Sequence, residues 1–348
     1  MVDWNLARRI ANQVAGSPPD VTLPGDLAAR CDDAATRVSA YAQLTPATPI
    51  PPPEAVDRRL WLELNLAGMQ ATLDPVLEKA LGNAPSAAAG PLRVAGGAVL
   101  GAEVGALSGY LGRRVLGQYE LQLLDPDYPP RLLFVAPNLA EAAGALDADL
   151  DELLSWVAFH EVTHAVQFSG VPWLRAHLAG LLTELLESLE LKVDLSSALS
   201  LPSMDDLRGL ADRLREGGLV GAVAGPERRA IVDRIQAVMG LIEGHAEHVM
   251  DAVGAAVLPN LPALRSAMNR RRADRSPLVR VIERLIGLDM KLAQYETGKA
   301  FCDAVVAEGG IERLNVAWSV AELLPGAAEL KDPAQWIART RVPAVTSG

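Results

Sequence analysis

Cysteine, histidine and aromatic residues are scarce in this chain of 348 residues. The two cysteines, Cys31 and Cys302, stand near opposite ends and offer neither a CxxC metal pair nor a disulfide framework. We therefore expect a reducing, cytoplasmic setting. Only 4% of the residues are aromatic although 50% are hydrophobic, so Ala, Leu and Val must supply the core. This composition favours helices and argues against an all-β sandwich or barrel.

Positive charge is also in deficit. The chain carries 32 basic and 43 acidic residues, a formal net charge of -11. This is the wrong sign for a surface that neutralises phosphates, so we expect neither nucleic acid nor an anionic membrane as a partner. The first residues lack the apolar run of a secretory signal. The length predicts one large domain or two coupled domains.

Long apolar runs are absent except at residues 95–112, where Glu103 is the only charged residue. Glycine recurs there at every fourth position, at Gly97, Gly101, Gly105 and Gly109. Such a ridge of small residues lets helix backbones approach closely. The run is rich in Gly and Ala and barely long enough to span a bilayer. We expect a buried helix here, without stable membrane insertion.

Proline and glycine divide the rest of the chain. A helical N-terminal segment is predicted over 1–44, a proline-rich connector over 45–53, and the main domain over 54–348. The first segment is either separate or part of one compact unit with the main domain. Alternation at 118–124 and an apolar run at 132–135 predict a short antiparallel hairpin, closed by Pro137 and Asn138. Helices are expected at about 148–168 and 227–253. The predicted fold is mainly α (α+β): many helices with a small antiparallel sheet.

Two of the five histidines occur in His160-Glu161-Val162-Thr163-His164, an HExxH motif. A spacing of four residues places both imidazoles on one helix face, where both can bind one metal ion. Glu161 lies about 100 degrees round the helix and can address a water on that metal. The uncharged flanks fit a buried helix. The motif predicts a Zn²⁺ site with His160 and His164 as ligands and Glu161 as general base.

A catalytic zinc needs a third protein ligand and an open position for water. The second histidine cluster lies within 243–251, where Glu243 and Glu247 share one helix face. Glu243-Gly244 resembles the start of the third-ligand motif in zincins of the aminopeptidase kind. On that resemblance Glu243 is the third ligand, and Glu247 accepts an N–H bond from a ligand imidazole. His245 or His248 as the ligand is the alternative, because imidazole also binds zinc.

Stretches along nearly the whole chain resemble a family of zincin-like hydrolases that is labelled as associated with deazaflavin-coenzyme biosynthesis and regarded as zinc-dependent metallopeptidases. They include Gly117-Gln118-Tyr119, Val135-Ala136-Pro137-Asn138, the run 160–168, Glu243-Gly244-His245-Ala246 and Gln294-Tyr295. The resemblance implies a mostly helical, gluzincin-like fold with a small sheet and a metal site built from His160, His164 and Glu243. It implies no particular substrate.

These features predict a zinc metallopeptidase or amide hydrolase that acts on a peptide or a small amide. An oxyanion donor is also needed, and Tyr295 is preferred over His245 and Tyr119 because it lies beside Lys291 and Gln294 on an otherwise apolar helix. The strand before the active-site helix is expected to pair with an extended peptide. The alternative is a zinc-binding structural or regulatory protein without turnover. The oligomeric state is not predictable from the sequence.

Overall fold

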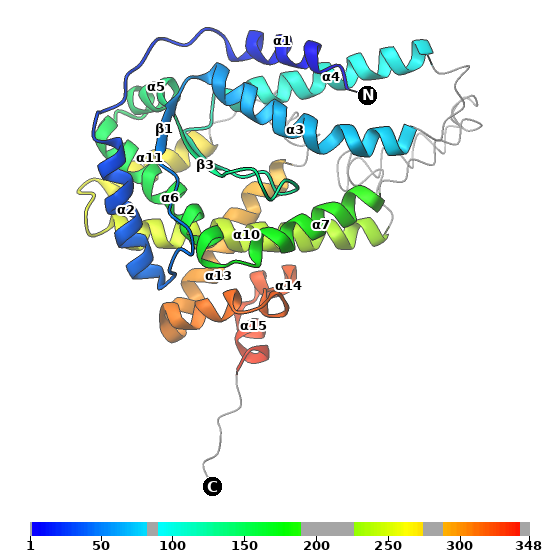
Figure 1. Ribbon diagram of the computed structural model, residues 1–348. Coiled ribbons are helices and arrows are strands. Elements are labelled where there is room, and N and C mark those ends of the chain that lie inside the picture. Colours follow the sequence, from blue (N-terminus) through cyan, green and yellow to red (C-terminus); the bar gives the residue numbers. More distant parts are fainter. Residues whose placement is uncertain (1, 82–89, 189–225, 274–287, 342–348) are drawn as a thin grey trace. The chain divides into compact units, whose positions relative to one another are not determined.

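The computed structural model (Figure 1) describes residues 2–81, 90–188, 226–273 and 288–341. Its first part contains α1 (Trp4–Ala15), α2 (Leu27–Ala42), β1 (Pro53–Val56), α3 (Arg58–Leu81), α4 (Gly90–Gly112), β2 (Gly117–Glu120), β3 (Arg131–Val135), α5 (Ala136–Leu146) and α6 (Leu150–Gly170). Then follow α7 (Leu174–Ser188), α10 (Pro226–Gly254), α11 (Leu261–Ala273), α13 (Leu288–Asn315), two short 3₁₀ turns, α14 (Ala327–Lys331) and α15 (Pro333–Arg339). The predicted mainly helical fold with a small sheet is confirmed.

The chain divides into two compact units, each built from segments that are discontinuous in sequence. One contains residues 2–36 and 49–165, and the other contains Arg37–Thr48, 166–188 and the described residues from 226 onward. The division falls inside α6, so this helix contributes to both units. The domain boundaries predicted at 44 and 53 stay a prediction.

The sheet has three strands in the order β1-β3-β2. β2 runs antiparallel to β3, with Gly117 opposite Phe134, which confirms the hairpin, although β2 ends at Glu120 and not at 124. The sheet also has a third strand that was not predicted: β1 pairs parallel with β3, with Pro53 opposite Leu132, so the small sheet is mixed. β1 was not predicted because it directly follows two prolines, which are typical of a connector. A proline is tolerated here because Pro53 begins a strand at the edge of the sheet.

α5 begins where the sequence indicated only a turn. Pro137 lies in the first turn of α5, where its missing N–H removes no helical hydrogen bond. Asn138 is buried, and its amide donates to the carbonyls of Gly112 and Val115 and accepts from Arg58 Nε. The polar residues that suggested a loop are therefore bonded inside the fold.

The glycine-rich stretch forms α4, which packs against α1 (Figure 1). A Cβ on Gly105 would lie 2.5 Å from the Ala7 carbonyl oxygen, and one on Gly109 would lie 2.5 Å from that of Ala11. The close helix contact predicted from the glycines is therefore present. The opposite face is not buried as expected, since Val99 is 57% exposed. Within the described residues, no helix has the length and apolar character needed to cross a membrane.

In the other unit, α10 and α13 make an even closer backbone contact. A Cβ on Gly298 would lie 1.9 Å from the Gly240 carbonyl oxygen, and one on Gly244 would lie 2.1 Å from the carbonyl carbon of Gly298. Gly244, which follows Glu243 in the predicted ligand motif, is thus required by helix packing. This contact fixes the position of α10 along α13.

Candidate metal centre

His160 and His164 lie on one face of α6, as their spacing predicts. Their Nε2 atoms are 3.3 Å apart, and their rings meet edge to face with centroids 4.7 Å apart. The distance exceeds the usual range of an N–H hydrogen bond. Two imidazole nitrogens bound to one tetrahedral zinc would be about 3.3 Å apart, given Zn–N bonds of about 2.0–2.1 Å. The spacing therefore fits a shared zinc ion.

Glu243 completes a group of three metal-ligating side chains. One ligand atom each from His160, His164 and Glu243 lies within 4.8 Å of the other two. All three residues are partly buried. Two imidazoles and a carboxylate are a donor set typical of catalytic zinc, which keeps one position for water or substrate.

Glu161 is held on the side of α6 that faces β2. Its carboxylate Oε2 accepts a hydrogen bond of 2.8 Å from the backbone N–H of Tyr119, and the residue is only 7% exposed. A Cβ on Gly117 would lie 2.7 Å from Glu161 Cγ and 3.0 Å from Oε1. Gly117 therefore lets β2 approach Glu161, the predicted general base. The described contact between Tyr119 and Glu161 is made by the Tyr119 backbone.

His245, an alternative ligand, is fully buried. The Gln167 side-chain NH₂ donates to the Ile242 carbonyl at 3.0 Å and lies 2.9 Å from His245 Nδ1. Because the atom facing the carbonyl must be the amide nitrogen, Nδ1 accepts and the proton of the neutral ring is on Nε2. His245 could therefore bind a metal only if it gave up the hydrogen bond from Gln167 or changed its tautomer.

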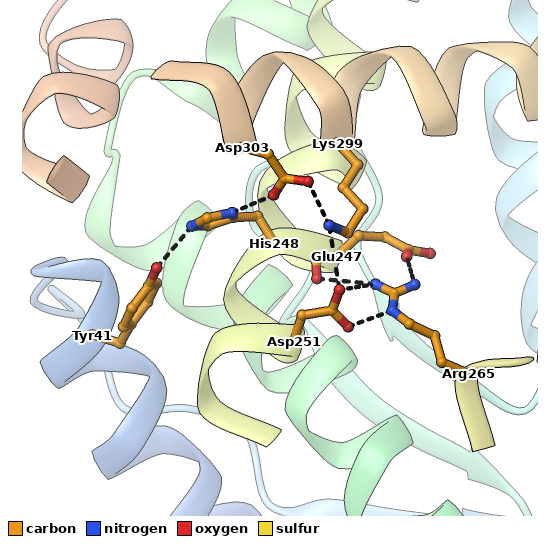
Figure 2. A network of polar contacts seen from close by, with 7 residues as sticks. All are labelled: Tyr41, Glu247, His248, Asp251, Arg265, Lys299 and Asp303. Carbon is orange, nitrogen blue, oxygen red and sulfur yellow. Dashed lines mark hydrogen bonds and ion pairs between the residues drawn. The ribbon is translucent and has the colours of Figure 1, made fainter. Parts of the chain in front are cut away.

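His248, the other alternative ligand, is held between two polar side chains (Figure 2). Its Nδ1 lies 2.7 Å from Asp303 Oδ1, and its Nε2 lies 2.8 Å from the Tyr41 hydroxyl. Burial works against the charged form of Asp303, but hydrogen bonds from His248 and Lys299 lower the pKa of that carboxyl. Burial and the Asp303 charge raise the pKa of Tyr41. The phenol thus stays protonated beside His248 Nε2.

Glu247 lies one turn after Glu243 on α10 and is 3% exposed. Its Oε2 accepts from Arg265 Nη1 at 2.8 Å. The predicted bond from a ligand imidazole to Glu247 stays a prediction. Arg265 also binds Asp251, which in turn contacts Lys299 (Figure 2).

Tyr295, the preferred oxyanion donor, belongs to α13, but its side chain lies outside the described part of the structure. Its role stays a prediction. Three further polar residues were not predicted from the sequence: Gln167, Arg265 and Asp303, which contact His245, Glu247 and His248 respectively. Periodicity gives no indication of these pairs, because they join residues on different helices. Gln167 could have been suspected, because it lies three residues after the HExxH motif and its neighbours Val166 and Phe168 are apolar.

Comparison with known proteins gives a family and a solved structure that this chain resembles. A crystal structure described as a "putative hydrolase with a novel fold" from Chloroflexus aurantiacus matches 97% of this chain and 98% of its own, with 32% sequence identity and a TM-score of 0.70. A search of the curated proteins finds no match. The family model described as zincin-like metallopeptidase matches residues 2–337. The chain therefore belongs to the zincin-like metallopeptidase family.

Proposed function

We propose that this protein is a zinc-dependent hydrolase that cleaves a peptide or amide bond, with His160, His164 and Glu243 as the metal ligands. The observation that carries the proposal is the group of three ligand atoms within 4.8 Å, beside a carboxylate that a backbone N–H holds in place. Membership of a metallopeptidase family and the likeness to a structure described as a hydrolase support it. The association with deazaflavin-coenzyme biosynthesis rests on the motifs alone and stays a prediction.

The bound zinc would supply a Lewis acid and lower the pKa of its water toward neutrality. Glu161 would act as the general base toward the attacking water and then give the proton to the leaving amine. The Tyr119 N–H keeps the carboxylate of Glu161 from turning away between these two steps. Glu247 accepts the N–H of a ligand imidazole and so fixes its tautomer. Tyr295 is proposed to donate to the oxyanion.

The test is the zinc content of protein purified without added metal, measured by elemental analysis. We expect about one zinc per chain in the wild type and a large loss in His160→Ala and in Glu243→Ala. His248→Gln is the matched control, because this histidine lies on the same helix as Glu243 and its two ring nitrogens contact Tyr41 and Asp303. Retention in Glu243→Ala with loss in His248→Gln would move the third ligand to His248.

Activity is tested separately with a peptide library and the Glu161→Gln variant. Loss of the general base is expected to lower turnover by roughly 10²-fold or more while zinc content is unchanged. A wild-type protein that binds zinc but cleaves no peptide or small amide would favour the alternative, a structural or regulatory zinc protein. A wild type that takes up no zinc even when it is supplied would contradict the proposed function.

A further inference from the structure

We infer that Arg265 is a positioning residue of the metal centre, acting through Glu247. The inference rests on the proposed function, in which Glu247 orients a zinc-ligating imidazole. Arg265 comes from α11 and contacts the face of α10 that carries Glu247 and Asp251. Arg265 therefore pairs with Glu247, the first carboxylate after Glu243 on this face of α10.

The guanidinium group bridges two carboxylates one helical turn apart (Figure 2). Its Nε and Nη2 bind the two oxygens of Asp251 at 2.6 and 2.5 Å, and its Nη1 binds Glu247 Oε2 at 2.8 Å. Only a planar fork with donors on several sides makes these bonds together, so a lysine would not replace it. The arrangement fixes the direction in which the Glu247 carboxylate points.

Glu247 needs such a partner because its side chain is only 5% exposed. A buried carboxylate without a partner turns toward another donor. A rotated Glu247 would be a poorer acceptor for an imidazole N–H. One bond to Arg265 leaves an ionised carboxylate with acceptor capacity for that N–H, because a carboxylate can accept about four hydrogen bonds.

Asp251 Oδ2, which Arg265 Nη2 binds, also contacts a second cation. Lys299 Nζ lies 3.3 Å from Asp251 and 2.6 Å from Asp303, which in turn binds His248. Burial works against the charge of Lys299, but the hydrogen bonds and charges of Asp303 and Asp251 together outweigh this and raise the pKa of the amine. Among the described contacts, Lys299 belongs to the same network without touching Glu247. It is therefore the matched control for Arg265.

The experiment is a double-mutant cycle on zinc affinity, measured by competition with a chromophoric chelator. Arg265→Gln and Glu247→Gln are each expected to weaken zinc binding by about 10-fold or more. If Arg265 acts through Glu247, the double variant binds zinc no more weakly than Glu247→Gln alone. Lys299→Gln is expected to leave the dissociation constant within about twofold of wild type.

Urea unfolding of the metal-free variants, in excess chelator, separates positioning from folding, because a purely structural role would lower the midpoint without changing affinity for zinc. Should Arg265→Gln fail to fold, Arg265→Lys takes its place in the cycle, since it retains the charge but not the fork. Additive losses in the double variant would overturn the inference, as would unchanged affinity in Arg265→Gln or in Glu247→Gln. Absence of zinc binding by the wild type would instead reject the proposed function.

Discussion

At the scale of single residues, the histidines of α6 and α10 differ in what their ring nitrogens contact. The Nε2 atoms of His160 and His164 face each other at a distance that suits a shared metal. If His245 bound a metal, it would lose its hydrogen bond to Gln167. If His248 bound a metal, it would lose its hydrogen bond to Tyr41 or to Asp303. Leaving a buried polar group without its partner costs about 1–3 kcal/mol. The hydrogen bonding thus favours Glu243 as the third ligand.

Gly117 provides a test of how the general base is held. In Gly117→Ala the new Cβ would lie 2.7 Å from Glu161 Cγ and 2.9 Å from Val157 Cγ1, so Glu161 must move. We expect hydrolytic turnover to fall by roughly 10-fold or more, because a displacement of about 1 Å at a reacting group can cost about 10²-fold. Zinc content should be unchanged, because Gly117 faces the base and not a ligand. Kinetics and elemental analysis on the same preparation measure both quantities.

Gly144→Ala is the control for that substitution, since a Cβ at Gly144 meets nothing within 4 Å. It should retain wild-type turnover. A Gly117→Ala variant as active as Gly144→Ala would show that the close approach of β2 to Glu161 has no part in catalysis.

The HExxH residues could be predicted from the sequence because their geometry is set within one helix. A spacing of four residues places two side chains on one face whatever surrounds the helix. The partners Gln167, Arg265 and Asp303 could not be predicted in the same way. Each of them contacts a side chain from another helix, so its role depends on tertiary packing that periodicity does not encode.

At the scale of elements, glycine sets how closely two pairs of helices approach. The α1–α4 contact could be expected in part, because glycine recurs in α4 at every fourth residue. The α10–α13 contact could not, since it uses two glycines of one helix and one of the other. β1 and α5 were missed for a related reason: proline is a typical residue of turns, yet it is tolerated at a strand edge and in the first turn of a helix.

The α10–α13 contact is tested by Gly298→Ala. The added Cβ would lie 1.9 Å from the Gly240 carbonyl oxygen and 2.8 Å from its carbon, and backbone atoms in a helix cannot move aside easily. We expect the free energy of unfolding to fall by at least about 2 kcal/mol, the range of overpacked cores. Urea unfolding monitored by circular dichroism gives this value.

Gly180→Ala in α7 is the matched substitution, because its Cβ would meet nothing within 4 Å. There alanine should stabilise the helix by up to about 1 kcal/mol. Equal midpoints for the two variants would show that α10 and α13 tolerate a wider separation than the structure indicates.

At the scale of the whole molecule, the proposed ligands come from α6 and α10, which lie far apart in the sequence. A metal that binds ligands brought together only by folding stabilises the folded chain, because the unfolded chain lacks the site. Removal of zinc by a chelator should therefore lower the thermal midpoint. Zinc at 100 times its dissociation constant contributes about 2.7 kcal/mol at the unfolding equilibrium.

This stabilisation should disappear in His160→Ala, whose thermal midpoint is expected to be the same with zinc and with chelator. His248→Gln should have a lower midpoint than wild type in both conditions, because it loses its bonds to Tyr41 and Asp303, yet it should keep the full zinc-dependent difference. Scanning calorimetry of the three proteins with and without zinc measures these differences. An equal zinc effect in wild type and His160→Ala would mean that zinc binds elsewhere, since a ligand stabilises a fold only through a site that the folded state possesses.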